Sequence, residues 1–177
     1  SCCITYMFSK VMKERLEKEK LIYTSNTDEL TRCLNRHAYE NDMKKLNLSE
    51  EWVYISVDLN GLKRANDSYG HMAGDELICA AADCMRDSFH EYGKVYRIGG
   101  AVIITENTSQ VEELIHGFDS NVANWHGKFV DSMTVSYGWV FSTERNWGSA
   151  YEISKAADAR MYQSKERYYK ESGADRR

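Results

Sequence analysis

The residues best suited to chemistry lie in one run, VDLNGLKRANDSYGHMAGDE, which spans Val57 to Glu76. An apolar segment ends there at a carboxylate, Asp58, and the chain then turns through Asn60-Gly61. A carboxylate at a strand end supplies an oxygen ligand of the kind that hard divalent cations prefer. A glycine beside it lets backbone N–H groups approach a bound phosphate closely. The run therefore predicts a metal-and-phosphate site.

The same run continues with a basic pair, Lys63 and Arg64, and then offers two polar side chains, Asn66 and Asp75, that could hydrogen-bond a base. Ordinary structural interpretations remain: Asp58 as a strand-end cap, and Asn66 and Asp75 as turn or cap residues. Other nucleotide and hydrolase signatures (G-x-x-x-x-G-K-[ST], G-x-G-x-x-G and G-x-S-x-G) are absent. The scattered histidines form no pair at metal-ligand spacing: His37, His71, His90, His116 and His126.

Composition indicates a single soluble domain, because 177 residues suffice for one full core. Charged residues make up 28% and the net charge is −4, which argues against a nucleic-acid duplex as partner. Five cysteines without a C-x-x-C pair predict a reduced, cytoplasmic setting with buried thiols. No apolar run is long enough to cross a membrane. The apolar opening SCCITYMF has two interpretations, the end of a membrane anchor of a longer parent or an unpacked helix end.

Periodicity and turn residues predict helices over residues 1–27, 28–46, 72–89, 109–125 and 149–169, and strands over 52–58, 94–98, 101–105 and 133–140. Gly99-Gly100 indicates a hairpin with a two-residue turn. This order predicts an α+β sandwich with helices on a mixed or antiparallel sheet of four or five strands. We divide the chain into a linker or stalk helix (1–27), one domain (28–172) and a disordered tail (173–177). The first helix fits either a solvated linker or a dimerising stalk.

Five blocks of the sequence resemble the GGDEF family, in family order and at family spacing: DELTRCLNR (28–36), VDLNGLKRANDSYGHMAGDE (57–76), YRIGG (96–100), TVSYGWV (134–140) and ADARMYQSK (157–165). The resemblance implies the nucleotide-cyclase and polymerase-palm fold, with a central, mostly antiparallel sheet. It also implies diguanylate cyclase activity, in which two GTP molecules on an antiparallel homodimer are joined into cyclic di-GMP and two pyrophosphates. An upstream sensor domain would act through the N-terminal helix.

The resemblance also assigns roles to residues at matching positions. Asp58, with the Leu59 carbonyl, would bind Mg²⁺ or Mn²⁺, and Asp58 and Lys63 would be the catalytic residues. Asn66 and Asp75 would read guanine, whose N1–H and N2–H are adjacent donors that adenine lacks. The phosphates would be held by four residues: Gly61, Leu62, Lys63 and Lys165.

Several positions depart from the family pattern. Asn60 replaces the second Asp of D-x-D, Gly61-Leu62 replaces the usual Phe turn, and Tyr169 replaces an expected Arg. The family's product-inhibition motif, R-x-x-D, falls at His90 and Gly93, so no such allosteric site is expected.

The signature itself is altered, because G-G-D-E-F reads Gly99-Gly100-Ala101-Val102-Ile103. Aligned without a gap, the acidic pair and the Phe are substituted; aligned with a gap, D-E-F is absent and AVIIT continues the strand. The gapped alignment fits better on both sides. A deletion of three residues would reverse the face of every following side chain. We therefore expect that three residues were either removed by engineering or form a missing stretch. If a stretch is missing, Gly100 and Ala101 should lie much further apart than the ~3.8 Å of neighbouring Cα atoms.

Loss of these carboxylates should lower the catalytic rate by at least about 10²-fold, because a metal ligand and a base are removed. Three hypotheses follow. The first is a diguanylate cyclase that is inactive or impaired as the sequence stands. The second is a catalytically dead module that binds GTP or only a partner protein. The third is a guanylate-type cyclase that acts on one nucleotide.

Overall fold

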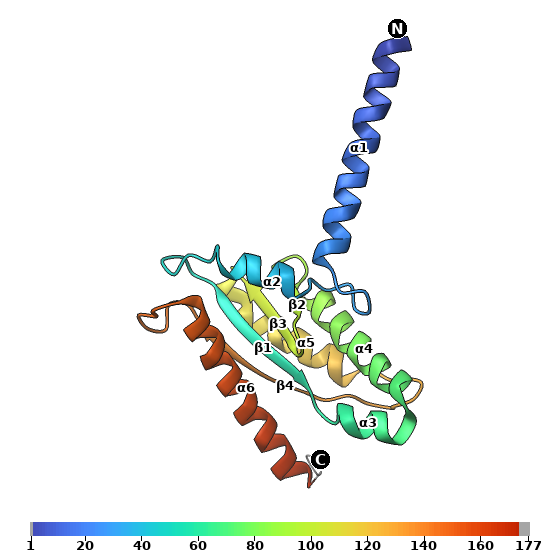
Figure 1. The fold of residues 1–177 in the computed structure, drawn as a ribbon. Coiled ribbons are helices and arrows are strands. Elements are labelled where there is room, and N and C mark those ends of the chain that lie inside the picture. Colours follow the sequence, from blue (N-terminus) through green and yellow to red (C-terminus); the bar gives the residue numbers. More distant parts are fainter. Residues whose placement is uncertain (1, 174–177) are drawn as a thin grey trace.

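A computed structural model of the protein describes residues 2–173. One four-stranded sheet carries helices on both faces, and the first helix extends away from this body (Figure 1). The elements are α1 (Cys2–Asn26), α2 (Arg36–Met43), β1 (Val53–Leu59), α3 (Leu62–Tyr69), α4 (His71–Phe89), β2 (Gly93–Arg97), β3 (Ala101–Thr105), the 3₁₀ turn η1 (Thr108–Gln110), α5 (Val111–Ala123), β4 (Val135–Phe141) and α6 (Ala150–Ser172).

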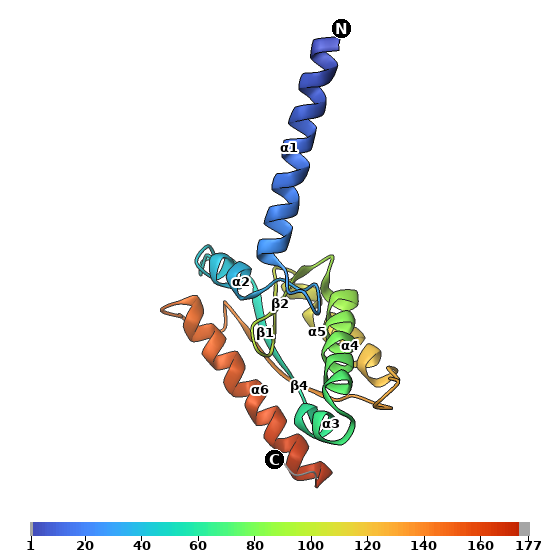
Figure 2. The ribbon, with the colours of Figure 1, turned by 45° about the vertical axis from the view of Figure 1, so that its right-hand side comes forward.

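The strand order is β2-β3-β1-β4, and every pair is antiparallel. Alternation along β1 sends Ile55 and Val57 into a core beneath α4 and α5, while Tyr54 faces a second core beneath α2 and α6. Figure 2 shows α4 and α5 on one side of the sheet and α6 on the other. The predicted α+β sandwich with a mostly antiparallel sheet of four or five strands is therefore confirmed, with four strands.

The predicted helix at residues 28–46 begins too early, because the structure starts α2 at Arg36. Asn35 is its N-cap and accepts the Ala38 N–H at 3.0 Å. Asp28 also accepts an N–H three residues on, from Thr31 at 2.9 Å, but Arg32 then adopts a positive φ of 59° and ends the turn. The sequence pattern did not predict α3, an eight-residue helix within the run Val57 to Glu76.

The hairpin between β2 and β3 corrects two further expectations. Its turn has three residues, 98–100, because Arg97 pairs with Ala101. The chain passes directly from Gly100 into β3, and the Ile98 N–H donates to the Gly100 carbonyl at 3.0 Å, so the predicted missing stretch is wrong. The shortened hairpin is tolerated because both faces of β3 are apolar and covered: Ile103 enters one core, and Val102 and Ile104 enter the other.

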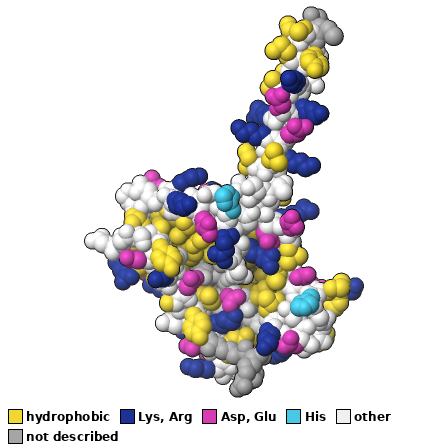
Figure 3. Space-filling model, viewed as in Figure 1, with side chains coloured by type: hydrophobic (Ala, Val, Ile, Leu, Met, Phe, Trp, Pro, Cys, Tyr) yellow, Lys and Arg dark blue, Asp and Glu magenta, His cyan; other side chains and the backbone are white. Residues whose placement is uncertain are grey.

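α1 projects from the domain and leaves apolar side chains on its surface, including Ile4, Phe8 and Leu21 (Figure 3). Cys3 is exposed on this helix, whereas Cys33 and Cys84 are buried, so the expectation of buried thiols holds only in part. No helix in residues 2–173 is both long and apolar enough to cross a membrane. The predicted disordered tail at 173–177 lies outside the described residues except for Gly173, the C-cap of α6.

Substitution of Gly138 should loosen the attachment of α6 to the sheet. A Cβ at Gly138 would lie 2.3 Å from the backbone N of Met161 and 2.7 Å from the Ala157 carbonyl oxygen. We expect Gly138→Ala to lower the free energy of unfolding by about 1–3 kcal/mol, because neither backbone atom can move away cheaply. Urea denaturation measures the change.

Gly117→Ala is the matched control, since a Cβ at this α5 position meets nothing within 4 Å. It should leave stability unchanged or raise it by up to about 1 kcal/mol. Equal stability of the two variants would contradict the close packing of α6 on β4 at Gly138.

Candidate active site

Asp58 lies near the end of β1, and its side chain points from the face of the sheet that α6 covers. The Lys165 Nζ of α6 forms an ion pair with Asp58 Oδ2 and donates a second hydrogen bond to the Leu59 carbonyl oxygen at 3.3 Å. The Asp58 side chain is 35% exposed and the Lys165 side chain 20%. A carboxylate and a carbonyl oxygen thus converge on one cationic group at the tip of β1.

The backbone N–H of Gly61 lies three residues beyond Asp58, and it donates to the hydroxyl of Tyr169 at 3.1 Å. Gly61 has a φ of +68°, which favours glycine, and it begins α3 as its N-cap. Tyr169 is one turn beyond Lys165 on α6. One helix therefore contacts both the proposed metal ligands and the proposed phosphate-binding N–H.

Asn60 stands between these two groups and is buried, with 6% of its surface exposed. Its Oδ1 accepts the Ser136 hydroxyl of β4 at 2.9 Å, while its Nδ2 has no hydrogen-bond partner in the described part of the chain. The Asn60 backbone N–H donates to the Thr134 carbonyl. Asn60 thus fixes the turn after β1 to the neighbouring strand. The residue that replaces the second Asp of D-x-D therefore has a structural role in this chain.

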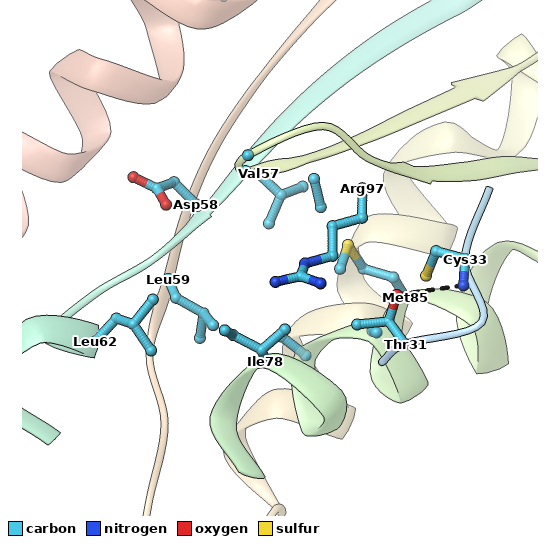
Figure 4. Close-up of a pocket in the computed structure, with 14 residues that line it drawn as sticks. Thr31, Cys33, Val57, Asp58, Leu59, Leu62, Ile78, Met85 and Arg97 are labelled. Carbon is cyan, nitrogen blue, oxygen red and sulfur yellow. Dashed lines mark hydrogen bonds between the residues drawn. The ribbon is translucent and has the colours of Figure 1, made fainter. Parts of the chain in front are cut away.

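Two hollows adjoin Asp58. The larger, about 600 Å³, is lined by Asp58, Gly100, Asp158 and Tyr162 among others, and this volume lies within the range of ligand pockets. The smaller, about 60 Å³, lies on the opposite face of β1 beside Leu59, Leu62, Ile78 and Arg97. Figure 4 shows the Asp58 carboxylate pointing away from these four side chains and toward α6. Asp58 is accessible and is not turned into the core.

The proposed base-reading residues lie on α3 and α4. Asn66 is half-buried, and its Oδ1 would lie 2.0 Å from a Cβ on Gly74, so the absence of a side chain at Gly74 makes room for it. The same Oδ1 has no hydrogen-bond partner among the described residues. Asp75, which follows Gly74 on α4, is exposed. The Asn66 amide oxygen thus lacks a donor, and Asp75 is the neighbour in sequence of the glycine against which Asn66 packs.

A half-buried ion pair between Asp28 and Arg97 lies beside the small hollow. Arg97 Nη1 donates to both oxygens of Asp28, each at 3.0 Å, and the Thr31 backbone and hydroxyl also donate to Asp28. Burial alone would raise the pKa of Asp28, but the hydrogen bonds from Thr31 and Arg97 outweigh it and hold the pKa below its ordinary value. This pair fixes the loop before α2 against β2.

A metal ion would find oxygen donors here but few of them. Residues 2–173 contain no cluster of three or more His, Cys, Asp or Glu side chains that could hold a metal. Asp58 and Leu59 nevertheless present two oxygens to a single cation, and the Lys165 ammonium occupies that position. The donor set fits a cation such as Mg²⁺, which commonly completes its shell with water and substrate oxygens.

The sequence-based site is thus partly assembled. Asp58, Leu59, Gly61 and Lys165 meet at the tip of β1, Leu62 lines the small hollow, and Lys63 is exposed on the first turn of α3. From the sequence, Tyr169 was recognisable only as a departure from the family pattern, and its contact with Gly61 was not predicted. Its spacing of four residues from Lys165 is the signal that could have identified it, because such residues share a helix face.

The sequence model of the family described as "Diguanylate cyclase, GGDEF domain" matches residues 25–170 of this chain. The match covers most of the sequence, so the chain belongs to the GGDEF family. This finding confirms the family that the five sequence blocks indicated.

Individual relatives agree with this assignment. The probable diguanylate cyclase DgcI of Escherichia coli (strain K12) is 32% identical over 143 residues, which are 78% of this chain and 30% of that protein. Diguanylate cyclase DgcM of the same strain is 28% identical over 172 residues, covering 92% of this chain and 41% of that protein. The chain therefore spans less than half the length of either relative.

Among solved structures, the fold is similar to the coiled coil and GGDEF domain of DgcB from Caulobacter crescentus, which was determined in complex with c-di-GMP. The TM-score is 0.76, the sequence identity is 23%, and 92% of each chain is covered. This likeness confirms the predicted fold class.

Removal of the Asp28 carboxylate should reduce the acid sensitivity of the fold. Because the pKa of Asp28 is lowered on folding, its contribution to stability is present above the unfolded value of about 3.9 and is lost as the pH falls through the folded value. We expect Asp28→Asn to lose about 1–3 kcal/mol at pH 7 and less at pH 2.5. Urea denaturation at both pH values measures this.

Asp87→Asn, at an exposed position on α4, is the control. It should change the free energy of unfolding by the same amount at pH 7 and at pH 2.5. An Asp28→Asn deficit as large at pH 2.5 as at pH 7 would show that the carboxylate charge contributes nothing.

Proposed function

We propose that this chain is a GTP-binding domain of the diguanylate cyclase type whose catalytic step is impaired. One observation carries the proposal: the Asp58 carboxylate and the Leu59 carbonyl converge on a single cation, three residues from the Gly61 N–H, in a chain of this family. Such an arrangement is suited to a nucleoside triphosphate, since the negative charge of the phosphates needs a cation and the phosphate oxygens need hydrogen-bond donors.

Asp58 and Leu59 would hold Mg²⁺ or Mn²⁺. A bound divalent cation would neutralise triphosphate charge and lower the pKa of the attacking 3′-hydroxyl. The backbone N–H groups of Gly61 and Leu62 would bind the β- and γ-phosphates. Lys63 would add a positive charge from the first turn of α3.

Asn66 and Asp75 would read the guanine base. The Oδ1 of Asn66 is an acceptor without a donor among the described residues, and a guanine N–H would satisfy it once the side chain turns this buried oxygen outward. The Asp75 carboxylate could accept from the adjacent N1–H and N2–H groups of guanine, which adenine does not offer.

The altered signature lies directly beside this site. A Cβ on Gly100 would be 2.9 Å from the Val57 carbonyl oxygen and 4.0 Å from Asp58 Oδ1. Carboxylates that follow this turn in the family signature would therefore sit next to Asp58. Their absence leaves Asp58 as the acidic side chain at the tip of β1 and accounts for the proposed impairment.

The second candidate is a non-catalytic module that binds GTP, or only a partner protein, and relays a signal through α1. The shortened signature and the internal ion pair at Asp58 favour it. Isothermal titration calorimetry with GTP separates these versions, since an interaction module without a nucleotide site gives no heat. A cyclase acting on one nucleotide would differ by its product.

The remaining expectations belong to the same proposal. A catalytic domain of this type would work as a homodimer with one GTP on each protomer. α1 would connect it to an upstream sensor domain, and its setting would be cytoplasmic.

Insertion of Asp-Glu-Phe between Gly100 and Ala101 should restore catalysis. We expect the inserted chain to form cyclic di-GMP from GTP at least about 10²-fold faster than the chain as it stands, because a metal ligand and a base return beside Asp58. Chromatography of the products with Mg²⁺ or Mn²⁺ measures the rate.

An insertion of Gly-Ser-Gly at the same point is the matched control for loop length and should remain inactive. The cyclase hypothesis fails if the Asp-Glu-Phe chain is folded by circular dichroism but converts no GTP. Measurable GTP binding by that same chain would then support the non-catalytic alternative.

A further inference from the structure

The last turns of α6 contact the backbone and side-chain groups that are proposed to bind the cation and the phosphates of a nucleotide. The Lys165 ammonium is bound to the Asp58 carboxylate and to the Leu59 carbonyl oxygen, which are the proposed cation ligands. The Tyr169 hydroxyl accepts the Gly61 N–H at 3.1 Å, which is the proposed phosphate donor. Because one hydrogen directs toward one strong acceptor at a time, a phosphate oxygen must replace the Tyr169 oxygen to use this N–H fully.

α6 is anchored at its beginning and more loosely held at its end. Its buried residues are Ile153, Ser154 and Ala157, all in the first half of the helix. No later residue of α6 up to Ser172 is fully buried. Local opening costs least where few apolar groups are buried, so the end of α6 can move away without disrupting the core.

Lys165 and Tyr169 also differ in what they could do after such a movement. The ammonium of Lys165 can transfer from Asp58 to a phosphate oxygen, because both are anionic acceptors. The Tyr169 oxygen, in contrast, competes with phosphate as an acceptor, since it takes a hydrogen bond from Gly61. The family pattern places a cationic Arg at this position, and a cation would add to phosphate binding instead of opposing it.

We propose that Lys165 and Tyr169 form a latch that keeps the nucleotide site closed from within, and that Tyr169 is the residue that sets how weakly GTP binds. The latch rests on the proposed function for its ligand, but its contacts exist without one. Nucleotide binding then requires the end of α6 to open, and the apparent affinity falls by the fraction of molecules that are open.

Tyr169→Phe tests the latch, because it keeps the ring against Tyr168 and removes only the hydroxyl. Tyr151→Phe, at an exposed tyrosine in the first turn of α6, is the matched control. In calorimetry with GTP and Mg²⁺, Tyr169→Phe should bind about threefold to tenfold more tightly than the unmodified chain, as expected for one released hydrogen bond. Tyr151→Phe should bind as the unmodified chain does.

A second measurement needs no nucleotide. Hydrogen exchange of the Gly61 amide, followed by NMR, should be faster by at least about threefold in Tyr169→Phe and unchanged in Tyr151→Phe. Lys165→Met should similarly let Mn²⁺ alone bind at Asp58, at least about threefold more tightly than in the unmodified chain.

The outcomes separate the latch from the proposed function. If GTP binds to no variant but Gly61 exchange accelerates in Tyr169→Phe, the proposed function fails, and the contact of Tyr169 with Gly61 is confirmed without a role in GTP affinity. If GTP binds to the unmodified chain and Tyr169→Phe changes neither affinity nor exchange, the latch is overturned. Weaker GTP binding by Tyr169→Phe also overturns it, because Tyr169 would then be a donor to phosphate.

Discussion

The close approach of α6 to β4 is the constraint on which the site depends. Gly138 carries no side chain, so the backbone of α6 at Met161 lies against the strand. The register of β4 on β1, with Ser136 opposite Asp58, places the tip of β1 beside the same helix. Lys165 lies one turn beyond Met161, and this distance brings its ammonium to the carboxylate.

Charge balance explains why a lysine can occupy this position. Asp58 contributes one negative charge at the tip of β1, and the Lys165 ammonium neutralises it with a second hydrogen bond to Leu59. A site with the additional carboxylates of the family signature would carry more negative charge than one ammonium can compensate, which favours a divalent cation. The ion pair between Asp58 and Lys165 is therefore consistent with the shortened signature, because without the signature carboxylates one ammonium balances the charge at the tip of β1.

The shortened hairpin also shows how a sheet covered on both faces tolerates changes in register. Every residue of β3 from Val102 to Ile104 is apolar, and helices cover the sheet on either side. A reversal of side-chain direction thus exchanges one buried environment for another. In a sheet with one face in water, the same deletion would expose the core.

The sequence alone predicted the order of most elements, a mixed or mostly antiparallel sheet of four or five strands, and the acid at the end of β1, because periodicity and turn residues act over a few positions. It placed Asp28 in a helix, although Arg97, 69 residues later, holds it in a loop. It identified Asp58 and Lys165 separately, but only the tertiary structure joined them across 107 residues. Tyr169 acquired its contact with Gly61 in the same way. Contacts of this range depend on where α6 crosses the sheet, and no local pattern encodes that placement.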